Sequence, residues 1–191
     1  VVSTAPAITE IIYELGKGKE LIGVSTYCNF PKEAQKLPKV GTPFTPNYEV
    51  LLKLKPDLVI TQSLEEGRFE KRVKELGIKT LGIKLTSYTD IKKGIKILKN
   101  ELSVEKESIL ERLEKKEEML KSLKRKGSFA ISIGTQESGR YAKDFMLGGD
   151  DTYLAEIIKF SGLKNVVGDV SGYKNFSIET LLKKSPYYLF L

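Results

Sequence analysis

Side chains that commonly carry out catalysis are scarce in this sequence of 191 residues. It contains no histidine and one cysteine, Cys28. Without histidine there can be no Ser-His or Cys-His nucleophile pair, no imidazole zinc site and no proximal histidine for haem. The single cysteine allows no internal disulfide, and such a residue is more often an inert packed side chain than a metal ligand. Most common enzyme mechanisms are therefore excluded, because their general base is histidine.

Aromatic and hydrogen-bonding side chains, by contrast, gather in segments that follow predicted strands. Ligands of open α/β sheets bind outside the carboxyl ends of the strands, where loops meet helix N-termini. Each aromatic residue taken singly is explained equally well by ordinary packing, whereas five in such loops together indicate a flat binding surface. The candidates are Tyr27, Phe30, Phe44, Tyr141 and Tyr173 as aromatic surface, Gln62, Ser63, Thr135 and Gln136 as hydrogen-bonding groups, and Arg140 as a cation.

Two other polar motifs have alternative explanations. Asp150 and Asp151 together could bind a cation, yet Asp151 or Thr152 as the cap of a following helix explains the pair more simply. Residues 134–139 follow a strand as a phosphate-binding loop would, but they lack the G-x-G-x-x-G spacing and a G-K-S/T ending. We therefore expect neither a metal centre nor a nucleotide-binding enzyme.

The composition, 40% apolar and 30% charged, indicates a soluble globular protein. A length of 191 residues suits one large domain or two small lobes. The net charge of +7 comes mainly from lysines interleaved with glutamates, so we expect a solvated surface and no nucleic-acid partner. No stretch reaches the roughly 20 apolar residues of a membrane span. No leader precedes Val1, which leaves room for one that has been removed.

Strands and helices are predicted to alternate through the first 85 residues. Residues 8–15 carry apolar side chains at helical spacing and are followed by Gly16. Asn47 is expected to cap a helix that ends at Pro56, and the apolar run at 58–60 is typical of a strand buried on both faces of a parallel sheet. Further elements are predicted as a strand at 21–24, a helix at 69–76 and a strand at 80–83. This alternation predicts an α/β fold with a mainly parallel sheet.

A helical connection is predicted to follow. Residues 90–102 have a helical pattern, and residues 104–125, which contain no Gly or Pro, predict one long helix of roughly 33 Å. Lys116 interrupts the apolar stripe of this helix, so its seam is narrow. A narrow seam suits a strut between two lobes, with a coiled-coil segment or an ordinary surface helix as the alternatives.

An internal repeat links the two ends of the chain. Residues 10–16 recur as residues 156–162 with four of seven positions identical. Residues 47–56 recur as residues 177–186 with Glu, Leu, Leu, Lys and Pro at matching positions. Chance similarity between amphipathic helices explains either match alone, but two matches in the same order indicate a duplicated α/β lobe.

The repeat predicts the domain organisation. We expect an N-terminal α/β lobe at residues 1–86, a helical connection at 87–126 and a C-terminal α/β lobe at 127–191. Because the second copy has no counterpart of residues 61–85, we expect the second lobe to be incomplete.

Several short motifs together carry a family resemblance. They are residues 1–10 (VVSTAPAITE), 22–24 (IGV), 27–31 (YCNFP), 39–41 (KVG), 47–60 (with LKPDLVI), 172–173 and 177–186. In this order they resemble the periplasmic solute-binding proteins of the helical-backbone type, which serve ABC importers of cobalamin, haem and ferric siderophores. The resemblance covers nearly the whole chain and is strongest to the vitamin B12-binding branch.

The resemblance implies a carrier in which two lobes, joined by one long helix, hold a small molecule in the cleft between them. A corrinoid such as cobalamin has a broad apolar face and amide edges, which the aromatic and hydrogen-bonding candidates would match. The alternatives within the family are a ferric siderophore or haem. Their anionic groups would suit Arg140, and haem iron could be held by a tyrosinate of Tyr141 or Tyr173. The absence of tryptophan departs from relatives that use indoles there.

The resemblance also implies a membrane partner. Family members dock onto the permease and ATPase complex of an ABC importer through one acidic residue on each lobe, and Glu70 matches the first position, with Glu65 and Glu66 nearby. A solvated helix start is the alternative for these glutamates, and the second acid would lie beyond Leu191. We expect a monomer without a cofactor, in the periplasm or at the cell surface as a lipoprotein. An enzyme on a Rossmann-like scaffold and a membrane-tethered sensor are the alternatives.

Overall fold

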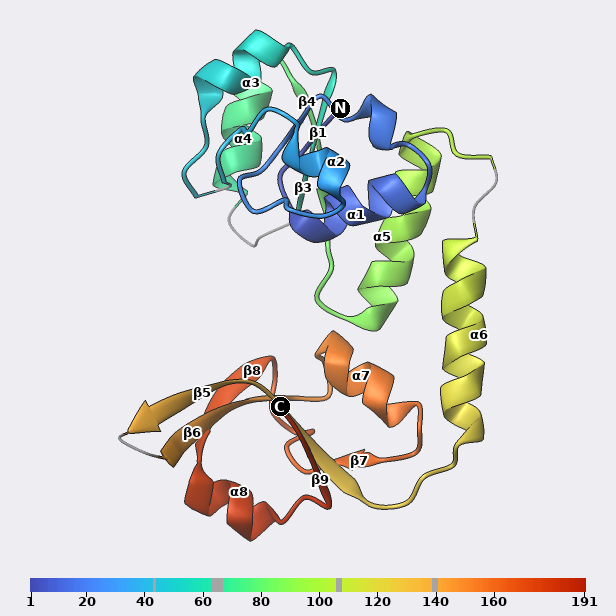
Figure 1. Ribbon diagram of the computed structural model, residues 1–191, viewed down its shortest axis with the longest axis vertical. Coiled ribbons are helices and arrows are strands. Elements are labelled where there is room, and N and C mark those ends of the chain that lie inside the picture. Colours follow the sequence, from blue (N-terminus) through green and yellow to red (C-terminus); the bar gives the residue numbers. More distant parts are fainter. Residues whose placement is uncertain (43, 63–66, 106–107, 139–140) are drawn as a thin grey trace. The chain divides into compact units, whose positions relative to one another are not determined.

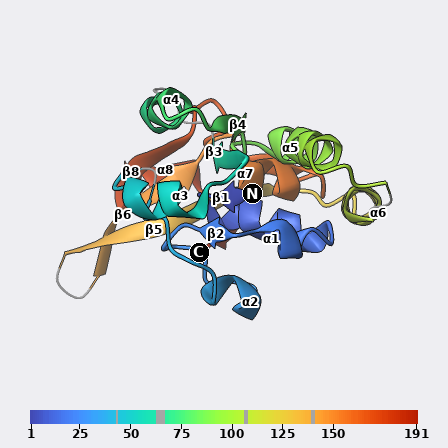
Figure 2. The same ribbon diagram turned by 90° about the horizontal axis from the view of Figure 1, so that it is seen from above.

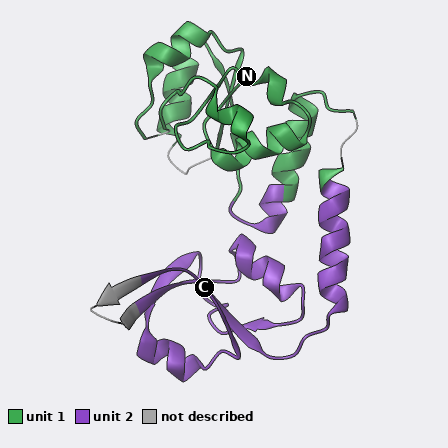
Figure 3. Ribbon diagram, in the orientation of Figure 1, with its two compact units in different colours: residues 1–85, 92–109 green, residues 86–91, 110–191 purple. Residues whose placement is uncertain are grey.

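The computed structural model describes residues 1–42, 44–62, 67–105, 108–138 and 141–191, with the backbone alone at 136–138 and 141–143. Figure 1 labels the helices and strands. The chain divides into two compact units, one of residues 1–85 and 92–109 and the other of residues 86–91 and 110–191 (Figure 3). The boundary between the two units falls inside two helices. It divides α5 (Tyr88–Glu101) between residues 91 and 92, and it divides α6 (Ile109–Ser122) after its first residue.

The first unit is built on a parallel sheet. Its strands are β1 (Val2–Ser3), β2 (Gly23–Val24), β3 (Leu58–Gln62) and β4 (Lys79–Ile83), in the order β2-β1-β3-β4. All three pairings are parallel, and Val2 lies between Gly23 and Val59. Val59 and Ile60 are fully buried, as the continuous apolar run predicts for a strand covered on both faces.

Helices cover both faces of this sheet. The helices that lie wholly in this unit include α1 (Pro6–Glu14), the short 3-10 helix η1 (Gly18–Glu20), α2 (Lys32–Gln35), α3 (Tyr48–Leu54) and α4 (Arg68–Glu75). Figure 2 shows α3 and α4 on one face, and α1 with α5 on the other. Leu51 of α3 and Val73 of α4 pack against Val59 in the core between helices and sheet. Asn47 caps α3 by accepting a hydrogen bond from Val50 N at 3.1 Å, as the sequence predicts.

The second unit contains a mixed sheet. Its strands are β5 (Ser128–Ser138), β6 (Tyr141–Gly148), β7 (Lys164–Asn165), β8 (Tyr173–Ser177) and β9 (Tyr188–Phe190), and its helices include α7 (Tyr153–Lys159) and α8 (Ile178–Lys184). The first part of β5 pairs in parallel with β7 and β9, whereas its later part pairs antiparallel with β6, which pairs antiparallel with β8. The α/β fold in two lobes is confirmed, and the mainly parallel sheet holds for the first unit.

The internal repeat is visible in the backbone. The order β2-β1-β3 in the first unit corresponds to β7-β5-β9 in the second, with all pairings parallel. Ser177 caps α8 as Asn47 caps α3, by accepting from the backbone N–H three residues on. Both helices end on a left-handed residue, Lys55 at φ 45° and Ser185 at φ 43°. The duplicated segments therefore share strand order, caps and helix stops.

The helix predicted at 104–125 is shorter than expected. In the structure α6 has 14 residues, about 21 Å at 1.5 Å per residue. Ser103, at φ 48°, follows the end of α5, and Lys124, at φ 45°, follows the last turn of α6. Left-handed residues of this kind stop helices, and neither is a Gly or Pro that the sequence pattern would have marked. No helix in the described part of the chain is long and apolar enough to cross a membrane.

Candidate functional site

Three of the predicted aromatic residues lie exposed on loops of the first unit. Tyr27 and Phe30 lie in the loop that follows β2, and each residue is 62% exposed. Phe44 lies in the next loop and is 79% exposed. The two loops are joined by a hydrogen bond from Thr26 N to Gly41 O at 3.0 Å. Large apolar side chains that are exposed together on neighbouring loops are typical of a binding surface.

The loop that bears Phe44 is a tight turn. Thr42 N donates to Thr45 O at 3.1 Å, and Thr45 N donates back to Thr42 Oγ1 at 2.9 Å. Gly41 has φ +80°, and a Cβ there would stand 2.4 Å from Thr45 O. The turn therefore requires glycine at this position, and its own hydrogen bonds hold Phe44 at the exposed end.

Cys28 anchors the loop that bears Tyr27 and Phe30. Its side chain is 1% exposed, and its Sγ lies 3.2 Å from Thr9 Oγ1 and 3.3 Å from Ser25 Oγ. Such buried polar contacts indicate a packed thiol rather than a ligand. Among the residues that the structure describes, no group of three or more acidic or cysteine side chains could hold a metal ion.

The polar candidates of the first unit lie at the end of β3. Gln62 is its last residue and is half-buried, whereas Ser63, Glu65 and Glu66 lie outside the described residues. Glu70, in the first turn of α4, accepts a hydrogen bond from the hydroxyl of Thr61, which is buried in β3. The carboxylate of Glu70 is therefore tied to the carboxyl end of the strand.

Thr135, Gln136, Arg140 and Tyr141 were expected in a loop that follows a strand, which is wrong for those of these residues whose backbone the structure describes. Residues 134–138 belong to β5 and Tyr141 begins β6, and Thr135 is an exposed strand residue opposite Phe145. The register shifts between Ser132 and Thr135, around Gly134, and a glycine within a strand commonly marks such a bulge. Arg140 and the side chains of Gln136 and Tyr141 lie outside the described residues.

Tyr173 is half-buried at the start of β8. A Cβ on Gly148 would stand 2.8 Å from its ring, so the ring packs directly over this glycine. Burial raises the pKa of the Tyr173 phenol above its ordinary value, while a hydrogen bond with Thr152 acts in the opposite direction. Burial therefore favours the protonated form of this phenol.

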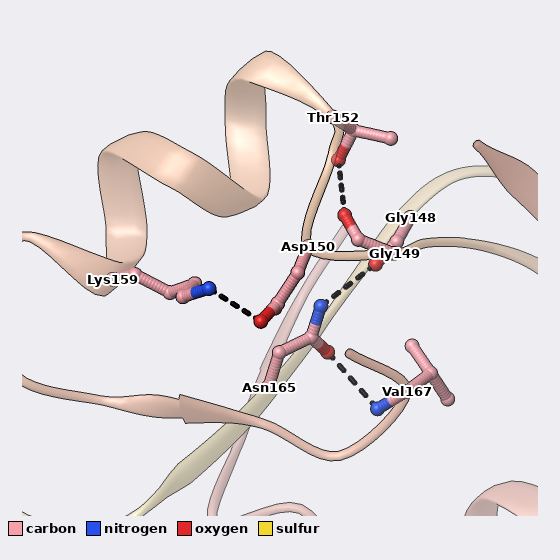
Figure 4. Close-up of polar contacts among 7 residues, drawn as sticks. All are labelled: Gly148, Gly149, Asp150, Thr152, Lys159, Asn165 and Val167. Carbon is pink, nitrogen blue, oxygen red and sulfur yellow. Dashed lines mark hydrogen bonds and ion pairs between the residues drawn. The ribbon is translucent and has the colours of Figure 1, made fainter. Parts of the chain in front are cut away.

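The turn between β6 and α7 holds polar contacts that the sequence did not predict. Figure 4 shows Thr152 Oγ1 donating to Gly149 O at 2.8 Å and Asn165 Nδ2 donating to Gly148 O at 2.9 Å. Asp150 Oδ2 pairs with Lys159, while Oδ1 is buried and finds no hydrogen-bond partner among the described residues. The glycine pair at 148–149, which lets neighbouring groups approach the backbone, was the available signal.

The two aspartates of this turn serve separate contacts. Asp151 accepts hydrogen bonds from Ser171 Oγ at 2.7 Å and Gly172 N at 2.8 Å, which lower its pKa. Thr152 is the N-cap residue of α7, but its side chain makes no capping hydrogen bond in the described structure. The expected side-chain cap is therefore replaced by a clamp from Asp151 onto residues 171–172.

A cavity of about 330 Å³ lies in the second unit, between α6, α7 and β9. Its walls are mainly apolar and include Leu120, Ile158 and Phe190, with Arg125 and Ser161 as its polar members. None of the binding residues predicted from the sequence lines it.

The full chain matches a known protein family. Residues 1–191 match the family described as periplasmic binding protein. An uncharacterized ABC transporter substrate-binding lipoprotein, YvrC of Bacillus subtilis, is 28% identical over 97% of this chain and 61% of its own length. A vitamin B12-binding protein of Vibrio parahaemolyticus is 29% identical over 100% of this chain and 69% of its own length. The chain thus spans about three fifths to seven tenths of these relatives.

Solved structures share the fold. The crystal structure of a possible iron-binding (periplasmic solute-binding) protein from Staphylococcus epidermidis has a TM-score of 0.80 and 26% identity, over 98% of this chain and 74% of that protein. S. aureus IsdE, solved in complex with heme, has a TM-score of 0.76 and 22% identity, over 98% of this chain and 73% of that protein. At the latter identity the likeness concerns the fold alone.

Proposed function

Because the chain belongs to the periplasmic binding protein family, we propose that it is the ligand-binding part of an extracytoplasmic solute-binding protein that delivers vitamin B12, or a related corrinoid, to an ABC importer. The location would be the periplasm or, for a lipoprotein, the cell surface, and the working state a monomer. The molecule bound would be cargo rather than a cofactor.

The observation that carries this proposal is the exposed aromatic surface of the first unit. Tyr27, Phe30 and Phe44 are each more than 60% exposed, on loops beyond the carboxyl end of β2. Exposed rings stabilise a complex when a flat apolar partner covers them, and a corrin offers such a face. The loops are held by Cys28 and by the Thr42–Thr45 turn, so little ordering entropy is lost on binding.

Hydrogen-bonding groups would complete the site. Gln62 at the end of β3 is half-buried and can donate and accept, which suits the amide edges of a corrinoid. On the second unit, Thr135 and Tyr173 are the candidates whose side chains the structure describes. A neutral Tyr173 phenol can hydrogen-bond an amide without a charge.

A ferric siderophore or haem is the second candidate, favoured by the possible iron-binding protein among the similar structures. Haem iron would be held by a tyrosinate of Tyr141 or Tyr173. A siderophore would carry its iron inside the chelator, and Arg140 would be the counter-charge for the anionic groups of either ligand.

Delivery requires a docking surface for the permease and ATPase complex. Glu70 is our candidate on the first unit, together with Glu66. The hydrogen bond from Thr61 fixes the direction of the Glu70 carboxylate, which is the kind of orientation that a docking contact with a basic pocket would use.

Titration of the purified chain with cyanocobalamin, ferric haem and a ferric tris-catecholate tests the proposal. Binding is followed by absorbance and by quenching of tyrosine emission, since the sequence has no tryptophan. We expect micromolar or tighter uptake of cyanocobalamin, weakened by Phe30→Ala and unchanged by Met119→Ala, an exposed residue of α6. Uptake of an iron ligand instead would select the second candidate, and binding of none of the three would overturn both.

A further inference from the structure

One side chain closes the loop that bears Phe30. Lys39 Nζ donates to Cys28 O at 3.1 Å and to Ala34 O at 3.0 Å, so a single ammonium group joins the two ends of residues 28–34. Gln35 Nε2 adds a hydrogen bond to Asn29 O at 2.6 Å, at a more exposed position. Hydrogen bonds from a charged donor are stronger than those between neutral groups.

The backbone of Lys39 is itself fixed to the sheet. Lys39 forms a parallel bridge with Val24 of β2. Val24 N donates to Pro38 O, and Val40 N donates to Val24 O, both at 3.0 Å. The lysine therefore extends from a rigid edge of the sheet, and its half-buried side chain reaches outward to the loop.

The two residues whose carbonyls it contacts are buried. Ala34 is 0% exposed and Cys28 is 1% exposed. Removing the charged donor from these partly buried carbonyls should cost free energy, more at Cys28 O than at Ala34 O, which also accepts from Leu37 N at 3.3 Å. The loop between them exposes most of Phe30. Without Lys39, this loop keeps the hydrogen bonds from Gln35 to Asn29 O and from Ala34 N to Pro31 O, but loses the donor that joins Cys28 to Ala34.

We propose that Lys39 is a positioning residue for the ligand: its ammonium group closes residues 28–34 into the shape that presents Tyr27 and Phe30 at the binding surface. This proposal rests on the proposed function for the role of the two rings. A loop that is already closed loses less conformational freedom on binding, and affinity falls in proportion to the fraction of molecules in the competent shape.

Three variants test the role of Lys39. Lys39→Met keeps the length of the side chain and removes its donors. Lys36→Met is the matched control, because Lys36 is an exposed lysine three residues away. Val73→Ala truncates a fully buried residue of α4, outside the loop. It controls for a loss of overall stability that leaves the hydrogen bonds of Lys39 intact.

Two measurements are made on each variant at a temperature below its thermal unfolding midpoint. The first is the affinity for cyanocobalamin, ferric haem and a ferric tris-catecholate. The second is the hydrogen exchange of the backbone amides of residues 29–37. For Lys39→Met we expect about 5- to 20-fold weaker binding of whichever probe the wild type binds, with faster exchange confined to this loop. Lys36→Met and Val73→Ala should keep wild-type affinity within twofold.

Unchanged loop exchange in Lys39→Met overturns the proposal, as does wild-type affinity in that variant. An equal loss of affinity in Val73→Ala overturns it too, because the effect would then follow overall stability. If the wild type binds none of the probes, the proposed function fails, and the exchange measurement still decides whether Lys39 holds the loop.

Discussion

Truncation of Phe44 to alanine should separate binding from stability. The ring is 79% exposed, so folding buries little of its surface and its removal should change the free energy of unfolding by less than about 0.5 kcal/mol. The turn is retained, because the backbone N–H groups of residues 44 and 45 still donate to the hydroxyl oxygen of Thr42. A ligand that covered one face of the ring would bury roughly half of a phenylalanine, or about 1 kcal/mol.

That free energy corresponds to an affinity about fivefold weaker. The assay is a cyanocobalamin titration of the wild type, Phe44→Ala and Leu182→Ala, with the midpoint of chemical unfolding measured in parallel. Leu182 is 69% exposed on α8 and serves as the control for a general change in surface hydrophobicity. Equal affinity of Phe44→Ala and the wild type for a ligand that does bind would refute the placement of the ligand on this turn.

Further predictions concern the two helix caps, the buried thiol of Cys28 and the hydrogen bonds of Asp151. Asn47→Ala and Ser177→Ala each remove a side-chain cap and should lower the free energy of unfolding by about 1 kcal/mol in denaturant titrations. Cys28, 1% exposed, should react with a thiol reagent only when the protein unfolds. Asp151 has a lowered pKa in the folded state. Its contribution is therefore present above the ordinary pKa of 3.8 and is lost as the pH falls through the folded value, and Asp151→Asn should flatten this acid-side loss of stability.

Much of the first unit could be predicted because its signals are local. Asn47 and Pro56 bracket α3 in the sequence, and the helix found runs from Tyr48 to Leu54. The buried run at β3 and the alternation of strands and helices identify a parallel sheet without knowledge of distant contacts. The family resemblance drawn from ordered motifs is confirmed by the match over residues 1–191.

The second unit was harder to predict because its sheet depends on distant pairing. Gly134 and Thr135 have the local sequence pattern of a loop, but pairing with β6 makes this segment part of a strand. The same limit applies to the binding surface. The exposure of the three aromatic rings can be predicted because Tyr27, Phe30 and Phe44 lie in predicted loops. The hydrogen bonds from Lys39 to Cys28 O and Ala34 O depend on tertiary contacts, which the sequence pattern does not show. The roles of these residues in binding stay predictions.

The paired left-handed helix stops offer a separate reporter for each half of the molecule. Lys55 belongs to the first unit and Ser185 to the second, and glycine adopts their backbone angles without the steric penalty of a side chain, a gain of about 1 kcal/mol. Lys55→Gly and Ser185→Gly can then be compared in calorimetry. If the halves melt as one body, either substitution moves a single peak, whereas halves that melt independently each respond to their own glycine.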